Sequence, residues 1–298
     1  MLLSFLKTVE AILKTPKFLL SKDASDYYEN LGDDVVEGEH EGFVDSKKPL
    51  WLNLGYWKEA RTYPDACVAM AGLVADAARL SPEDELLDVG FGFAEQDFVW
   101  LESRGVKRIT GINITPLHVE RAQARVKERG LEARIDLRFG SATDIPFEDN
   151  SFDKVTALEC AFHFNTRDRF FSEAMRVLRP GGRLAVADML PEPDKGALTL
   201  LNKICLKRWS IPLENMYDRD EYCRRLTAVG FREVTNQSIR DYVYTGTMKY
   251  SALRKRGVPM NEAFVDVTPE DIEQRVGIRD WEPTGITDYV IFGAQKPA

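Results

Sequence analysis

Blocks of apolar and amphipathic sequence alternate between about residues 82 and 190. The short apolar runs have the length of buried strands, and they read ELLDVG, RITGINI, IDLRFGSA, FDKVTAL and GGRLAVADM. Longer helical patterns lie between them, over 95–105, 116–130 and 166–182, with proline or glycine at their boundaries. This alternation predicts a mostly parallel sheet with helices on both faces and a ligand at the carboxyl ends of the strands.

The alternation loosens after Met189. ALTLLNKICLKRW and DRDEYCRRLTAVG have helical patterns, and GFREVTNQSI and DYVIFGAQK resemble two late strands that flank a helical segment, MKYSALRKRG. Two late strands at the end of an α/β sheet commonly pair with each other. We therefore predict one domain over 81–298, with a lid insertion at about 190–225, preceded by a helical lid segment over 1–80.

The first twenty residues, MLLSFLKTVEAILKTPKFLL, are rich in leucine and phenylalanine. Lysine and glutamate interrupt every apolar run well short of the ~20 residues that a membrane span requires, and no small-residue cleavage site follows. Leu2, Leu6, Val9 and Leu13 share one helical face. The pattern predicts an amphipathic helix that packs on the domain, with a lid or a weak contact to a membrane surface as alternatives, and no transmembrane segment.

The composition narrows the class of protein. The chain has 298 residues, 44% of them hydrophobic, and a net charge of −8, which argues against a nucleic-acid partner because such a partner requires a basic face. Four cysteines lie far apart and three histidines are scattered, so neither a metal site nor a disulfide framework is indicated. We expect a cytoplasmic protein that acts on small molecules, and the sequence leaves its oligomeric state open.

A glycine-rich turn follows the first strand, in LLDVGFGFAEQD at residues 86–97. A strand, such a turn and a helix together form a backbone cradle for a nucleotide-like ligand. The dinucleotide pattern GxGxxG would place a third glycine at Glu95, where a carboxylate would repel a pyrophosphate. This substitution disfavours a nicotinamide or flavin cofactor.

Further motifs follow the turn in a specific order: ITGINIT, GSATDIPFEDNSFDKV and FFSEAMRVLRPGGRLAVAD. With LLDVGFG, this region resembles the class I S-adenosylmethionine-dependent methyltransferases, and more closely their ubiquinone/menaquinone, tocopherol and natural-product branch. The resemblance covers about a third of the chain, with a weaker extension through WLNLGYW at 51–57. It implies a Rossmann-like sheet of seven mostly parallel strands and S-adenosyl-L-methionine as cofactor, with S-adenosyl-L-homocysteine as product.

The resemblance also implies cofactor-binding positions. Asp88 and the turn formed by Gly90, Phe91 and Gly92 would line the methionine end, and Ala94 replaces a frequent third glycine. S-adenosylmethionine has no phosphate, so a turn that offers backbone amides and close approach is sufficient.

Two departures from the family pattern lie at the next strand ends. Asn113 stands where the family usually has an acid on the ribose hydroxyls, and an amide can still donate and accept hydrogen bonds. Ile114 would lie against the adenine. Gly140-Ser141-Ala142 stands where the family often has Gly-Asp-Ala, so Ser141 replaces the acid. Ser141 would reach the adenine by its hydroxyl and Ala142 by its backbone amide.

Aromatic residues precede the domain. S-adenosylmethionine, the cofactor of this family, carries a positively charged sulfonium, and aromatic faces attract cations. Tyr56 and Trp57 could therefore cover the cofactor. Ordinary packing of the leading segment explains each of these residues equally well.

The segment ALECAFHFNTRD, residues 157–168, follows the fourth strand, where the transferable methyl group must point. His163 is the candidate general base because its unperturbed pKa is near neutrality, while binding the cofactor or capping a helix is its alternative role. Glu159 could orient this histidine or anchor the methionine ammonium. Cys160 is interpreted as packing, since methyl transfer needs no thiol.

The leading hypothesis is methyl transfer to a small, rather apolar organic acceptor, with oxygen as the favoured target. The reaction is an in-line displacement, so alignment and exclusion of water are the main requirements. Methylation of carbon in a prenyl, quinone-like or terpenoid substrate, methylation of nitrogen, and a non-catalytic cofactor-binding partner protein are the alternatives. No sequence feature identifies the acceptor.

Overall fold

The computed structural model describes residues 25, 49–193, 196–255 and 285–298. The amphipathic helix predicted over the first twenty residues lies outside this part of the chain. The domain boundary at 80 and the extent of the lid insertion stay predictions.

The described strands form one sheet of seven. They are β1 (Glu85–Val89), β2 (Arg108–Asn113), β3 (Ile135–Phe139), β4 (Phe152–Leu158), β5 (Leu178–Leu190), β6 (Arg232–Ser238) and β7 (Asp288–Gln295). Their order is β3-β2-β1-β4-β5-β7-β6, in which the first five are parallel and β7 runs antiparallel to both β5 and β6. The predicted fold class and the pairing of the two late strands are confirmed.

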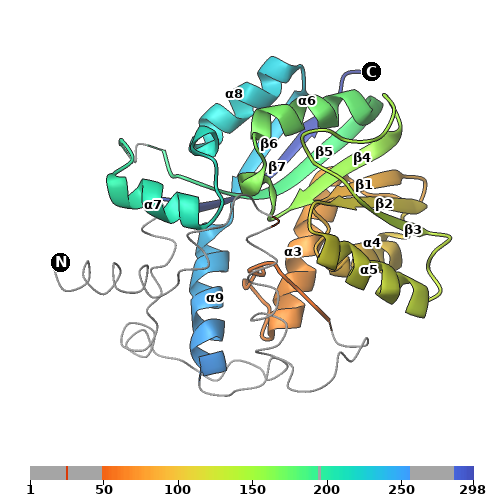
Figure 1. Cartoon of the computed structure of the whole chain (residues 1–298), viewed down its shortest axis with the longest axis horizontal. Helices are drawn as coiled ribbons and strands as arrows, with labels where there is room; N and C mark the ends of the chain where they lie inside the picture. Colours follow the sequence, from red (N-terminus) through yellow and green to blue (C-terminus); the bar gives the residue numbers. More distant parts are fainter. Residues whose placement is uncertain (1–24, 26–48, 194–195, 256–284) are drawn as a thin grey trace.

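Helices cover both faces of the sheet (Figure 1). The α-helices are α3 (Tyr63–Ala78), α4 (Glu95–Arg104), α5 (Pro116–Glu128), α6 (Arg167–Val177), α7 (Leu200–Arg208), α8 (Arg219–Val229) and α9 (Arg240–Lys255), and the short 3-10 helices are η2 (Ala161–His163) and η3 (Leu213–Asn215). Figure 1 shows α6 and α8 on one side and α3, α4 and α5 on the other. Among the described residues, the helices are too short or too polar to cross a bilayer.

Alternation along β1 divides the interior into two cores. Leu86 packs with α3, α4 and α5, whereas Leu87 and Val89 pack with α6 and α8. Helix α3 belongs to the segment predicted as a lid, but its buried face, with Met70 and Val74, lies directly on the sheet. The helix predicted over 166–182 ends earlier, at Val177, because Leu178 is extended and pairs with Phe152 of β4.

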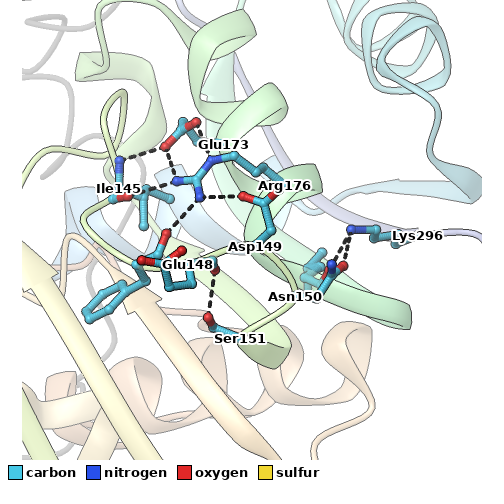
Figure 2. Close-up of polar contacts among 10 residues, drawn as sticks. Ile145, Glu148, Asp149, Asn150, Ser151, Glu173, Arg176 and Lys296 are labelled. Carbon is cyan, nitrogen blue, oxygen red and sulfur yellow. Dashed lines mark hydrogen bonds and ion pairs between the residues drawn. The ribbon is translucent and has the colours of Figure 1, made fainter.

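Arg176 of α6 joins two of the sequence motifs (Figure 2). Its guanidinium donates to the carbonyls of Ile145 (2.8 Å) and Phe147 (2.7 Å), and it forms an ion pair with Glu173 (2.7 Å) and Asp149 (3.0 Å). Glu173 in turn accepts from the backbone amide of Ile145 at 2.8 Å. This pairing explains why the segments DIPFEDNSFDKV and FFSEAMRVLRPGG occur together, since one carries the cations and carboxylates that hold the other's loop.

Candidate active site

A cavity of about 180 Å³ lies at the carboxyl ends of β1, β2 and β4, where the strand order reverses. The segment 50–53 forms another wall. Most of the predicted site residues line this cavity together: Gly90, Phe91, Gly92, Asn113, Ile114, Ser141, Ala142, Glu159 and His163. Asp88, Tyr56 and Trp57 do not line it.

Other parts of the chain pack closely against the two glycines of the turn. Gly90 has φ +79°, and a Cβ there would lie 2.6 Å from Cys160 Sγ. Gly92 has φ +58°, and a Cβ there would lie 3.1 Å from Leu52 Cδ1. Both glycines therefore meet a conformational and a steric requirement, and the cavity wall at this point is backbone.

Asp88 lies behind the turn, fully buried, and acts on it through a neighbour. Its carboxylate accepts from Thr156 Oγ1 at 2.8 Å and from Gln96 Nε2 at 2.9 Å. Gln96 also donates to the carbonyl of Phe91, at 3.0 Å. Burial raises the pKa of Asp88 to about 6, with Asp97 close by. Asp88 thus supports the turn from beneath.

The sequence argument that used Glu95 rests on a wrong premise. Its carboxylate does not line the cavity: it forms a buried ion pair with Arg125 of α5 and accepts from the backbone amide of Leu50 at 2.7 Å. Because Arg125 compensates its charge, Glu95 would exert little repulsion on a ligand in the cavity. Through this bond Glu95 fixes the backbone at Leu50, the first residue of the segment 50–53.

Asn113 and Ser141 line the cavity but also serve their own turns. Asn113 Oδ1 accepts from the amide of Thr115 at 2.9 Å, and Ser141 Oγ accepts from the amide of Thr143 at 3.2 Å. These are local side-chain to backbone bonds of the kind that fix turns. The oxygen of Asn113 thus has one lone pair in use by the chain, and the rest of the amide borders the cavity.

Glu159 occupies a strained position at the end of β4. It has φ +54°, and its amide donates to the carbonyl of Ala187 at 2.8 Å. The carboxylate Oε2 accepts from Leu54 N at 2.9 Å and from the Tyr289 hydroxyl at 2.7 Å. Burial raises the pKa of Glu159 to about 8, against the opposing effect of these two hydrogen bonds. Glu159 therefore fixes the backbone at Leu54, just after the segment 50–53. Glu95 fixes the backbone at Leu50, at the start of that segment.

His163 closes η2 and is almost fully buried at the cavity wall. Its Nδ1 lies 3.2 Å from the carbonyl oxygen of Ser210. Burial lowers the pKa of His163 to about 4, although the carbonyls of Ser210 and Trp209 favour protonation. The imidazole is therefore neutral near pH 7, and the near-neutral pKa that made His163 the candidate base in the sequence does not hold for the buried ring. Cys160 donates its thiol to the carbonyl of Val89 at 3.1 Å, in agreement with a packing role.

Comparison with known proteins identifies the family. A family profile described as a methyltransferase domain matches residues 87–186. The chain is 35% identical to the erythromycin 3''-O-methyltransferase of Saccharopolyspora erythraea over 275 residues, which cover 89% of this chain and 88% of that protein. The chain belongs to the class I S-adenosylmethionine-dependent methyltransferases.

Two further similarities extend this result. The 27-O-demethylrifamycin SV methyltransferase of Amycolatopsis mediterranei is 29% identical, with 87% of this chain and 95% of that protein covered. The structure of geranyl diphosphate C-methyltransferase from Streptomyces coelicolor A3(2), in complex with Mg²⁺, geranyl diphosphate and S-adenosyl-L-homocysteine, superimposes with a TM-score of 0.64. It is 19% identical, and 91% of this chain and 98% of that chain are covered. This methyltransferase uses S-adenosylmethionine and acts on small molecules.

The cavity of the methyltransferase fits its cofactor. S-adenosylmethionine needs a close backbone approach and no phosphate site, and the turn at Gly90 and Gly92 is a cradle that any Cβ would fill. Among the described residues, no cluster of histidine, cysteine and carboxylate side chains could hold a metal ion.

Tyr56 and Trp57 lie in an aromatic cluster beside α3 and α9. The ring of Trp57 stacks on Tyr63 at 6.3 Å between centroids and lies 5.8 Å from Tyr250, while Tyr56 meets Tyr242 edge-on at 5.6 Å. At this end of the methyltransferase, Leu50, Leu52 and Asn53 line the cavity instead. Contact between the two aromatic side chains and the cofactor stays a prediction.

Sequence reasoning missed some residues of the cavity. His118 in the first turn of α5 lines it, and burial lowers the pKa of this histidine to about 4. Its ring lies 4.5 Å from that of Phe93. The available signal was its position on the buried face of the amphipathic helix 116–130, next to Val119 and Ala122. Gln96 gave no comparable signal. The segment 50–53 overlaps the WLNLGYW motif of the family resemblance, but only the fold shows that it reaches the turn.

Proposed function

We propose that this methyltransferase transfers the methyl group to a hydroxyl oxygen of a small, rather apolar natural product of the erythromycin or rifamycin kind. The observation that carries the proposal is the 35% identity to an erythromycin 3''-O-methyltransferase across nearly the whole length of both chains. The second relative is also named for an oxygen acceptor.

The proposed contacts to the cofactor come mainly from the first three strand ends. The backbone of Gly90 and Gly92 accommodates the methionine portion, and the amide nitrogen of Asn113 reaches the ribose. Ile114 and Ser141 border the adenine. His118, whose pKa burial lowers to about 4, lines the same cavity.

The bound cofactor supplies a methyl group already activated by its sulfonium. The residues of this chain align the acceptor, exclude water and remove a proton. His163 is the proposed base: Nδ1 faces the carbonyl of Ser210, so Nε2 carries the lone pair in the neutral imidazole. Its lowered pKa keeps this form populated from about pH 5 upwards.

The test is turnover with S-adenosylmethionine and a panel of acceptors, followed by mass analysis. The panel contains 3''-O-demethylated erythromycin, 27-O-demethylrifamycin SV, a simple phenol and geranyl diphosphate. We expect a methyl ether on one of the first two. Methylation of geranyl diphosphate alone would overturn the oxygen assignment, and absence of turnover with all four would remove the acceptor class.

The base assignment has its own variants. His163→Ala should lower kcat by about 10²-fold or more, the usual contribution of a general base, with little change in the affinity for S-adenosylmethionine. His118→Ala is the matched control, because it removes another buried histidine of the same cavity. This control should weaken cofactor binding in calorimetry and leave kcat at saturation nearly unchanged. A His163→Ala enzyme with full kcat would reject the base.

A further inference from the structure

The part of the predicted lid that contains α7 and η3 contacts the segment around His163 from one side. Ser210, just after α7, presents its carbonyl to Nδ1 of His163. Asn215, the last residue of η3, is 1% exposed and lies against the same segment. Both contacts join residues about fifty positions apart in the sequence.

Asn215 bridges the residues on either side of His163. Its Nδ2 donates to the carbonyls of Phe162 (3.1 Å) and Phe164 (2.7 Å). Its Oδ1 accepts from the backbone amide of Arg167 at 3.0 Å. Because both amide hydrogens and the amide oxygen are used, the side chain has one fitting orientation and fixes the turn that carries the imidazole.

A buried ion pair anchors this arrangement to the sheet. The guanidinium of Arg167 contacts Asp188 of β5 at 2.8 Å, donates to the carbonyl of Met189 at 2.9 Å, and donates to the backbone carbonyl of Asn215. Arg167 and Asp188 are both essentially inaccessible to solvent. The turn at His163 is thus fastened to β5 through Asn215 and Arg167.

We propose that Asn215 is a positioning residue that holds His163 as the neutral Nδ1–H tautomer. A carbonyl oxygen can only accept, so Nδ1 carries the proton in its bond to Ser210, and the carbonyl of Trp209 likewise favours a protonated ring nitrogen. Asn215 keeps the ring against that carbonyl by holding Phe162 and Phe164 in place. The catalytic consequence rests on the proposed role of His163 as base, whereas the tautomer itself does not.

The tautomer is measurable without any acceptor. The chain has three histidines, at positions 40, 118 and 163, so ¹⁵N-labelled histidine gives few NMR signals, and His163→Gln and His118→Gln assign them. For His163 in the full-length protein we expect the Nδ1–H pattern at pH 7, retained down to about pH 5. The charged groups nearest the ring are Arg167 of α6 and, through it, Asp188 of β5.

Asn215→Ala should release the turn. We expect the proton to distribute over both ring nitrogens and the midpoint of the His163 titration to rise by about one pH unit or more, because solvent enters. With an acceptor, kcat should fall about tenfold while the KM for S-adenosylmethionine stays constant. If this variant does not fold, Asn215→Ser provides the same test, since its hydroxyl cannot bridge both carbonyls.

The matched control destabilises helix α7 of the predicted lid insertion but leaves the contacts of Asn215 with Phe162 and Phe164 in place. Thr199 caps α7 in a capping box with Asn202, and Thr199→Ala should cost about 1 kcal/mol of stability. This variant should keep the wild-type tautomer. The proposal is overturned if wild-type His163 shows the Nε2–H pattern, if folded Asn215 variants keep the Nδ1–H pattern and titration, or if Thr199→Ala changes them equally. Full turnover by His163→Ala would reject only the base.

Discussion

The two ends of the cavity are constructed differently. At the proposed cofactor end, the turn at Gly90 and Gly92 offers backbone, and uncharged side chains such as Asn113 and Ser141 complete the wall at the ends of β2 and β3. At the opposite, proposed acceptor end, two ionisable side chains line the cavity, Glu159 just after β4 and His163 in η2. The fully buried ion pair between Arg167 of α6 and Asp188 of β5 lies close to His163.

This difference has an electrostatic consequence. A binding site made of backbone amides keeps its charge and shape when the pH changes, because the backbone does not titrate. Buried ionisable groups change charge with pH and are destabilised when a partner is removed. The acceptor end should therefore be the sensitive end, and the cofactor end should be sensitive only to changes of backbone shape. Three substitutions test this comparison, from the largest expected effect to the smallest.

Arg167→Ala removes one partner of the ion pair at the acceptor end. It leaves Asp188 buried and uncompensated, so we expect a loss of about 3–5 kcal/mol in the free energy of unfolding. Urea denaturation followed by circular dichroism measures the change. The double variant Arg167→Met with Asp188→Leu should recover much of the loss because it buries no charge. If the double variant were as unstable as the single one, the loss of stability would come from lost packing and not from the uncompensated charge of Asp188.

Gly90→Ala changes the backbone of the cofactor end. The left-handed φ and the clash with Cys160 should together cost about 2–3 kcal/mol and weaken S-adenosylmethionine binding at least tenfold in calorimetry. Gly72→Ala on α3 is the control, since a Cβ there has open space and alanine favours helices. Equal loss of binding in both variants would show that this turn is not the cradle.

Glu159→Gln sharpens the comparison through pH. The carboxyl has a pKa of about 8 in the folded protein, and about 4.3 is usual for an unfolded chain. Between these values the folded state binds more protons, so stability falls as pH rises from about 4 to about 8. The Glu159→Gln variant does not lose stability in this way, because glutamine does not titrate. Its advantage should grow by about 1–2 kcal/mol over that range, a value reduced for solvent screening of a half-buried group.

Melting temperatures of both proteins from pH 5 to pH 9 measure the Glu159 effect. Glu102→Gln on the exposed side of α4 should give curves parallel to wild type. A constant difference between Glu159→Gln and wild type across this range would mean that the carboxylate is charged and tolerated throughout.

The sheet and much of the cofactor end could be predicted from local patterns. Apolar runs, helix boundaries and the glycine turn depend on neighbours in sequence, and these were enough for the strand types. The grouping of Gly90, Asn113 and Ser141 around one cavity came from the family resemblance, and the cavity lining agrees with it. Glu95 was misjudged because its partner, Arg125, lies thirty positions away, and nothing in the local pattern shows which way the side chain turns.

The acceptor end resisted prediction for the same physical reason. The lowered pKa of His163 and the raised pKa of Glu159 come from burial, which only the assembled fold creates. Asn215 stood in an unremarkable loop sequence, ENMYD, and its contacts to Phe162 and Phe164 require the insertion to reach the end of β4. Tertiary contacts of this kind have no periodic signature.

Strand β7 lies between β5 and β6, although it is made last of the seven. During synthesis, the parallel part from β3 to β5 can therefore assemble while β5 still has an unpaired edge and β6 has no neighbour. The hydroxyl of Tyr289 that binds Glu159 also arrives on this strand. Until residues 288–295 join the sheet, β5 keeps an unpaired edge and Glu159 lacks its Tyr289 partner, so the last strand both closes the sheet and completes the surroundings of Glu159.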